Sequence, residues 1–103
     1  MAMRRVVVTG LGIVSSIGVG KDAVRQSLRN ATSGIVLQPD YVERGFRSQV
    51  AGTIKTELED HIDRRALRFM GPPAGYAYIA MQEALADSGM EEADYAENDR
   101  VGL

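Results

Sequence analysis

Three arginines crowd into one predicted helical turn, at Arg64, Arg65 and Arg68. Arg64 and Arg68 are four residues apart and Arg65 and Arg68 three apart, so their guanidinium groups share one side of a helix. Like charges this close repel one another, and either local acids or an acidic partner can relieve the repulsion. Asp60 lies four residues before Arg64 and offers an ion pair within the chain. From these residues alone, a solvated helix face and an anionic docking patch are equally good interpretations.

A second candidate is the glycine-rich segment RRVVVTGLGIVSSIG at residues 4–18, which begins like a dinucleotide-binding loop. Such a loop carries Gly-x-Gly-x-x-Gly after a strand and leads directly into a helix, whose N-terminus faces the pyrophosphate. Here Gly10 and Gly12 are present, but Ser15 stands at the third position and the predicted helix begins several residues late. The acidic residue expected about 20 residues further on is also missing. A nicotinamide-dependent oxidoreductase is therefore the alternative that this partial match indicates.

The other polar residues have simpler structural interpretations. Ser15 and Ser16 lack the Gly-x-Ser-x-Gly of a nucleophile elbow, and we expect them to bond the local backbone in a turn. His61 is the only histidine, has no partner at metal-ligand spacing, and is expected to be a half-exposed surface residue. The carboxylates in the same polar stretch are expected to form a solvated face; they are Glu57, Glu59, Asp60 and Asp63.

Composition narrows the class of protein. With 45% hydrophobic and 25% charged residues, the chain is typical of folded globular proteins. Its net charge of -2 gives no drive toward nucleic acid or an anionic membrane, and its lack of cysteine excludes thiolate chemistry from these residues. The apolar run after Arg5 is interrupted by Thr9 and by glycines and has no cleavage site, so we do not expect a signal peptide here. No run approaches the ~18 apolar residues of a membrane span. We expect a cytoplasmic protein.

Hydrophobic periodicity predicts the elements of the first half of the chain. The β-branched run at residues 5–9 predicts a strand buried on both faces of a parallel sheet. From residue 20 the apolar residues fall at helical spacing, which predicts a helix that Ser33 and Gly34 end. Residues 35–37 and 48–54 are predicted to be short extended segments, with a turn at residues 38–40 between them.

In the second half, residues 57–70 are helical in character until Gly71, Pro72 and Pro73 interrupt the pattern. The prolines suit the start of a following helix over residues 74–88, which Gly89 closes and whose small apolar residues imply close packing. Residues 100–103 read as the opening of another buried strand. We therefore expect residues 1–103 to be the N-terminal portion of a longer protein and no complete independent domain.

The segment VVVTGLGIVSSIG resembles the N-terminal strand and turn of the β-ketoacyl-acyl carrier protein synthases, the condensing enzymes of fatty-acid synthesis. Five further motifs occur in the family's order and spacing: SGI, FRSQVAG, DRRALRFM, YIAMQEALADSGM and RVGL. The resemblance covers nearly the whole chain, and VSSIG and IDRRALRFM are more similar to synthase I than to synthase II. The consecutive prolines at Pro72 and Pro73 are a departure from the family pattern.

The resemblance implies an α/β, thiolase-like fold with layered α-β-α-β-α architecture, of which this chain is the N-terminal part of the first half, and it implies a homodimer. It also implies decarboxylative Claisen condensation of an acyl thioester with malonyl-acyl carrier protein. The catalytic cysteine and two histidines of such enzymes would lie beyond residue 103, and His61 matches neither histidine. No cofactor or metal is implied. A non-catalytic relative such as a chain-length factor is a further alternative.

The resemblance also favours one interpretation of the arginines. In synthase I, the segment matching residues 63–70 belongs to the surface that receives the acidic helix of acyl carrier protein. By this resemblance, Arg64, Arg65 and Arg68 are expected to dock the carrier protein, with Arg47 nearby. An acidic enzyme needs such a local positive patch to capture an acidic partner, and the capture should be sensitive to salt.

Overall fold

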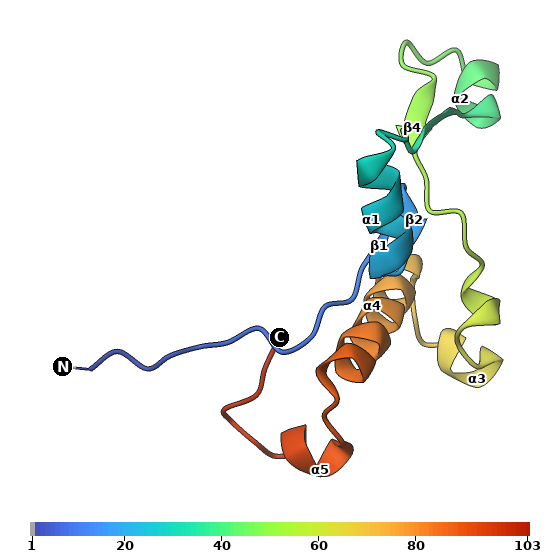
Figure 1. Cartoon of the computed structure of the whole chain (residues 1–103). Coiled ribbons are helices and arrows are strands. Elements are labelled where there is room, and N and C mark those ends of the chain that lie inside the picture. Colours follow the sequence, from blue (N-terminus) through green and yellow to red (C-terminus); the bar gives the residue numbers. More distant parts are fainter. Residues whose placement is uncertain (1) are drawn as a thin grey trace.

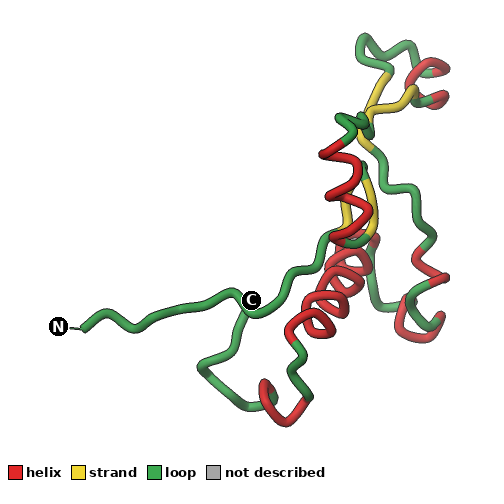
Figure 2. The backbone as a smooth tube through the Cα atoms, in the orientation of Figure 1, coloured by secondary structure: helices red, strands yellow, loops and turns green. Residues whose placement is uncertain are grey.

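A computed structural model describes residues 2–103 as an elongated arrangement of helices and short strands (Figures 1 and 2). Its principal extents are 57 × 36 × 27 Å, and its radius of gyration of 17.7 Å exceeds the roughly 13 Å of a compact domain of this length. The elements in chain order are β1 (Val14–Ser15), β2 (Gly18–Val19), α1 (Lys21–Arg29), β3 (Ile35–Leu37), α2 (Pro39–Glu43), β4 (Val50–Gly52), the 3₁₀ turn η1 (Leu58–Asp60), α3 (Arg64–Leu67), α4 (Pro72–Ser88) and α5 (Glu92–Tyr95). This mixed content agrees with the expected α/β class.

Helix α4 is the longest element; the predicted helix and its end at Ser88 are confirmed, but it begins at Pro72, two residues earlier than predicted. Pro72 and Pro73 occupy its first turn, where the missing N–H groups have no helical partner to lose. Gly89 ends the helix with a φ of 71°, the left-handed conformation that favours glycine. None of the helices in residues 2–103 is long and apolar enough to cross a membrane.

Helix α1 is also confirmed, but the prediction that Ser33 and Gly34 end it is wrong. The helix stops at Arg29, and Asn30 is its C-cap. Ala31 follows with a positive φ of 50°, which takes the chain out of the helix two residues before Ser33.

The two pairs of strands are short and antiparallel. β1 pairs with β2 in a tight hairpin that the sequence did not predict, and β3 pairs with β4 with Val36 opposite Ala51. The short extended segments expected at residues 35–37 and 48–54 are thus confirmed in part, as β3 and β4. The turn expected at residues 38–40 is instead the start of α2, with Pro39 in its first turn.

The predicted strand at residues 5–9 is not formed in this structure. Residues 2–13 run as an extended arm, and Val6 and Val8 are 92% and 85% exposed. A strand needs a neighbour to accept and donate its backbone hydrogen bonds, and no other part of residues 2–103 lies beside the arm as a strand. The strand predicted at residues 100–103 is absent for the same reason.

The prediction of one helix over residues 57–70 is also wrong. The segment contains two short pieces, η1 and α3, separated at His61–Asp63, where Asp63 is extended and forms the N-cap of α3. Ile62, which lies between the two pieces, is one of only two buried large apolar residues in the described chain, and Val24 of α1 is the other. The core of residues 2–103 is therefore very small.

Candidate functional site

The glycines of the opening segment lie directly against helix α4. A Cβ atom at Gly10 would overlap the carbonyl oxygen of Ala84, and one at Gly12 would overlap the carbonyl oxygen of Ala80. Only glycine, which has no side chain, allows the backbone of the opening segment to come this close to the backbone of α4. The glycines therefore serve backbone packing.

Two carboxylates of α4 take the backbone N–H groups of the same segment. Ile13 donates to Glu83 Oε2 over 2.9 Å, and Lys21 at the start of α1 donates to Glu83 Oε1 over 2.7 Å. One helical turn later, Leu11 donates to Asp87 Oδ2 over 3.0 Å, and the Lys21 ammonium group pairs with Asp87 Oδ1. The Lys21 hydrogen bond, followed by that of Leu11, holds the pKa of Asp87 below its ordinary value of 3.8.

This arrangement leaves no place for a pyrophosphate. A dinucleotide-binding loop needs free N–H groups and a helix N-terminus that face the phosphate oxygens. Here those donors, including the N-terminal N–H of α1, already bond Glu83 and Asp87, whose negative charges would repel a phosphate. The nicotinamide-dependent alternative therefore has no support in the structure.

Ser15 and His61 have local partners, whereas the backbone bonding expected for the Ser16 side chain is not seen among the described residues. Ser15 Oγ donates to the carbonyl oxygen of Gly18 over 3.2 Å and accepts from the Ile17 N–H over 3.3 Å, the turn bonding that was expected for it. His61 is exposed, and its Nε2 lies 3.0 Å from Thr56 Oγ1. Within residues 2–103, no three histidine, cysteine or acidic side chains are grouped closely enough to hold a metal ion.

Helix α3 presents the three clustered arginines to solvent. Arg64 and Arg65 lie in its single turn, Arg68 is its C-cap residue, and all three are exposed. None of them forms an ion pair with a residue in the described part of the chain, so the pairing that Asp60 offers to Arg64 is not made. The structure thus contains three adjacent guanidinium groups without a carboxylate to neutralise them.

The inner side of α3 is apolar and holds the helix in place. Leu67 and Met70 are half-buried, and together with Leu58 of η1 and Tyr76 of α4 they line a small hollow. α3 and α4 each contact η1. The arginines are therefore carried by a short helix that is fixed on one side.

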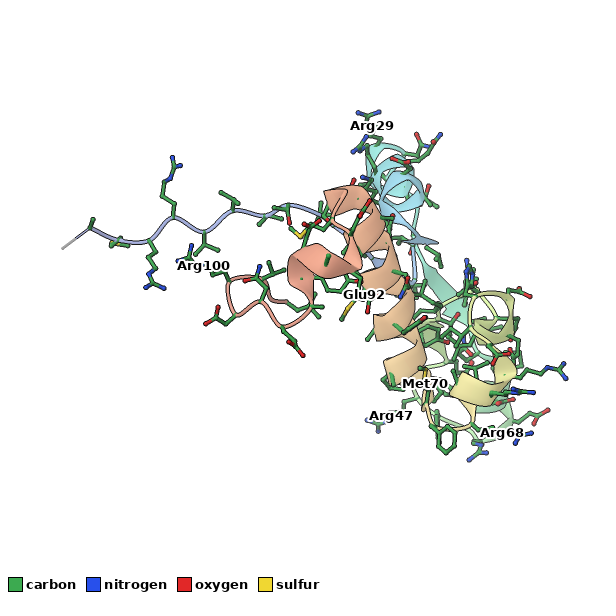
Figure 3. All side chains as sticks on the ribbon, turned by 90° about the horizontal axis from the view of Figure 1, so that it is seen from below. Arg29, Arg47, Arg68, Met70, Glu92 and Arg100 are labelled. Carbon is green, nitrogen blue, oxygen red and sulfur yellow. The ribbon has the colours of Figure 1, made fainter. Side chains whose placement is uncertain are left out.

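Arg47 lies in a different part of the structure. It belongs to the loop between α2 and β4, which Figure 1 shows at the top, whereas α3 lies at the lower right. Viewed from below, Arg47 and Arg68 are on the same side of the molecule (Figure 3). The structure thus brings Arg64, Arg65 and Arg68 together. It places Arg47 apart from them but on the same side of the molecule as Arg68.

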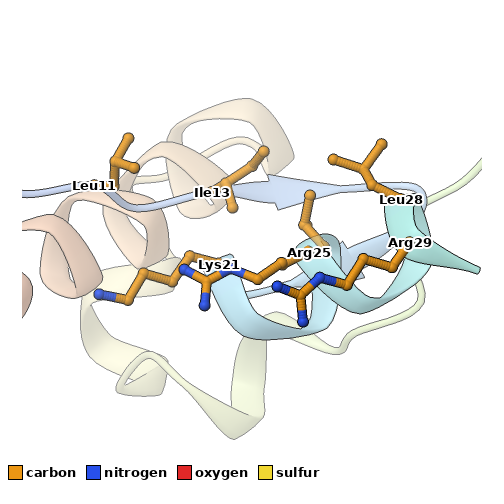
Figure 4. Close-up of a pocket in the computed structure, with 7 residues that line it drawn as sticks. Leu11, Ile13, Lys21, Arg25, Leu28 and Arg29 are labelled. Carbon is orange, nitrogen blue, oxygen red and sulfur yellow. The ribbon is translucent and has the colours of Figure 1, made fainter.

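One feature escaped the sequence reasoning, an open groove of about 520 Å³ between the opening segment and α1 (Figure 4). Its lining combines apolar and basic side chains from Leu11, Ile13, Lys21, Val24, Arg25, Leu28 and Arg29. The four-residue spacing of Lys21, Arg25 and Arg29 was a visible sign of a basic row on one side of α1. Its lining residues include no nucleophile and no acid–base pair, so the groove has the features of a binding surface and not of a catalytic site.

The chain is similar to known condensing enzymes over almost all of its length. Residues 3–103 match the family described as Beta-ketoacyl synthase, N-terminal domain. The 3-oxoacyl-[acyl-carrier-protein] synthase 1 of Haemophilus influenzae is 54% identical over 101 residues, and that of Escherichia coli K12 is 45% identical over 101 residues. Each alignment covers 98% of this chain and 25% of the relative. The 3-oxoacyl-[acyl-carrier-protein] synthase 2 of Staphylococcus aureus strain COL is 32% identical, over 97% of this chain and 24% of the relative. The chain spans about a quarter of the length of these curated relatives.

Proposed function

Since the chain belongs to the β-ketoacyl synthase family, we propose that the whole protein is a 3-oxoacyl-acyl carrier protein synthase that elongates fatty acyl chains. The observation that carries this proposal is the 54% identity to a synthase 1 over 98% of the chain. The lower identity of 32% to a synthase 2 favours the type 1 assignment, in agreement with the VSSIG and IDRRALRFM motifs.

The proposed reaction is a decarboxylative Claisen condensation. A cysteine accepts the acyl group as a thioester, and malonyl-acyl carrier protein then loses carbon dioxide to give a carbanion that attacks this thioester and releases the cysteine. Two histidines stabilise the charge that develops during decarboxylation. Residues 1–103 contain no cysteine and a single histidine, so this site must come from further residues of the protein.

The role proposed for residues 1–103 is to form the N-terminal part of the first half of a layered, thiolase-like homodimer in the cytoplasm. The exposed valines at Val6, Val7 and Val8 support this role. Their β-branched side chains suit a strand with both faces covered, and further chain of the same protein is the expected source of the neighbouring strands.

The catalytic proposal is tested with the purified full-length protein. Incubation with an acyl donor and malonyl-acyl carrier protein should release carbon dioxide and form a 3-oxoacyl product two carbons longer. A protein that binds acyl carrier protein but forms no product would be a chain-length-factor-like relative. If titration of the protein with NADPH shows saturable binding in the micromolar range, the synthase assignment is overturned.

We further propose that Arg64, Arg65 and Arg68 dock the acidic acyl carrier protein. Their side chains are exposed, adjacent and free of ion pairs within residues 2–103, so they can present several guanidinium forks to carboxylates. Arg47 is proposed as a second contact, because it lies on the same side of the molecule as Arg68 (Figure 3).

Single substitutions in the full-length enzyme test this docking. Each exposed charge pair is worth about 0.2–1 kcal/mol, so Arg65→Ala and Arg68→Ala should each reduce carrier-dependent turnover a few-fold, and the double variant more. Turnover of a small-thiol acyl donor should stay the same, and added salt should narrow the gap to wild type. Arg29→Ala, on α1, is the matched control and should behave like wild type. A double variant that uses the carrier protein normally would show that the docking patch is elsewhere.

A further inference from the structure

The outer side of α3 carries an aromatic ring as well as charge. Phe69 is 91% exposed and is the most exposed aromatic residue in the described chain. Its N–H donates to the carbonyl oxygen of Ala66 over 3.1 Å, which continues the turn of α3 by one more residue. Phe69 therefore lies in the turn that follows α3, directly after Arg68 and four residues after Arg65.

The other apolar side chains of the chain differ from Phe69 in how they are covered. Leu67 and Met70 face the hollow beneath α3 and are half-buried. The other phenylalanine, Phe46, packs its ring against Tyr41 with the ring centroids 5.2 Å apart. The exposed valines of the opening segment lie on an arm without a neighbouring strand. Phe69 alone combines an uncovered ring with a short helix whose opposite side is fixed.

We propose that Phe69 is the apolar anchor of the carrier-docking surface, a role that rests on the proposed function of the arginines. Arg68 directly precedes Phe69, Arg64 and Arg65 lie one turn earlier on α3, and their positive charge selects an acidic partner. Rim charges steer association and contribute little each, whereas an aromatic side chain that enters a dry pocket on the partner supplies much of the binding energy. The occupant proposed for this surface is the acyl carrier protein, whose acidic surface complements the arginines.

The test uses the full-length enzyme with two acyl donors. Phe69→Ala should lower carrier-dependent kcat/KM roughly 30-fold or more, the range of an interface anchor, and leave turnover of a small-thiol donor unchanged. This loss should persist at high salt, because an apolar contact is not screened, whereas the loss in Arg68→Ala should shrink. Phe69→Tyr keeps the ring and can hold its hydroxyl at the wet border, so it should retain most of the wild-type activity.

Leu28→Ala is the matched control, because Leu28 is 69% exposed on α1, and it should change turnover of neither donor. Two results would overturn the inference. One is carrier-dependent turnover in Phe69→Ala equal to wild type. The other is an equal loss on both donors with a lowered melting temperature in both Phe69→Ala and Phe69→Tyr, which would show that the ring is packed inside the enzyme.

The anchor and the arginine docking can fail separately. If Arg65→Ala and Arg68→Ala impair use of the carrier while Phe69→Ala does not, the anchor is wrong and the docking patch stands. If none of these substitutions affects use of the carrier, both are wrong.

Discussion

Glu83 links three distant parts of the chain, and its removal should weaken the fold measurably. Its carboxylate accepts the N–H of Ile13 over 2.9 Å and the N–H of Lys21 over 2.7 Å, from residues 70 and 62 positions earlier in the sequence. The Lys21 N–H is one of the first-turn donors of α1 that no helical carbonyl can accept. Glu83 therefore attaches both the opening segment and the start of α1 to α4.

The expected magnitude follows from these two bonds. A hydrogen bond to a charged group contributes about 1.5–3 kcal/mol net. Glu83 is only half-buried, so water can replace part of what is lost, and Glu83→Ala should reduce the free energy of unfolding by about 1.5–3 kcal/mol in total. Glu83→Gln keeps one carbonyl oxygen as an acceptor and should lose about half as much.

Urea denaturation of the full-length protein measures this change. Gln82→Ala is the matched control, since Gln82 precedes Glu83 on α4 and is exposed, and it should change stability by less than about 0.5 kcal/mol. The reasoning is refuted if Glu83→Ala is no less stable than Gln82→Ala, because the two bonds would then contribute nothing.

Three further predictions concern the same contacts and the fold as a whole. The lowered pKa of Asp87 means that its carboxylate stabilises the fold above pH 3.8 and that this contribution is lost as pH falls through the lower folded pKa. The melting temperatures of wild type and Asp87→Asn should therefore differ at neutral pH and converge in acid. A difference in melting temperature that stays constant with pH would contradict this. Gly12→Ala should cost the full-length protein about 1–3 kcal/mol, because its Cβ would meet the α4 backbone, whereas Gly71→Ala, whose Cβ would make only an ordinary 3.8 Å contact with the Pro73 ring, should cost far less in the same denaturation assay. Residues 1–103 expressed alone should be poorly folded and inactive, since their apolar core is so small; a dispersed amide NMR spectrum with a cooperative thermal transition would show otherwise.

Elements that depend on local signals could be predicted from the sequence. Helix α4 begins with Pro72 and Pro73 in its first turn, where proline is tolerated, and ends where Gly89 permits a left-handed φ, and neither end depends on residues far away. The helix beginning at Lys21 follows likewise from its own periodicity. In each case the backbone hydrogen bonds are made within the element itself.

Elements that need a distant partner could not be predicted in the same way. Residues 5–9 have the composition of a buried strand, but strand formation requires a neighbour, and residues 2–103 provide none for this segment. The β1–β2 hairpin has only two residues in each strand, too few for an alternating pattern to be recognised. The arginine cluster illustrates a further limit, because its spacing predicted a shared side of α3, while the absence of an Asp60–Arg64 pair became visible only in the structure.

The opening glycines show why a short motif needs its distant partners for interpretation. Gly10 and Gly12 would serve equally well under a phosphate or against a helix, because both require a backbone without side chains. The structure decides between these roles through α4, where Ala80 and Ala84 accommodate the glycines and Glu83 and Asp87 accept the N–H groups of the same segment. The two alanines are four residues apart, and so are the two acids, so the sequence of α4 already contained a row of small residues beside a row of acids. In this chain, the row of acids supplies the internal anions that accept the N–H groups of the glycine segment, and the row of small residues leaves room for its glycines.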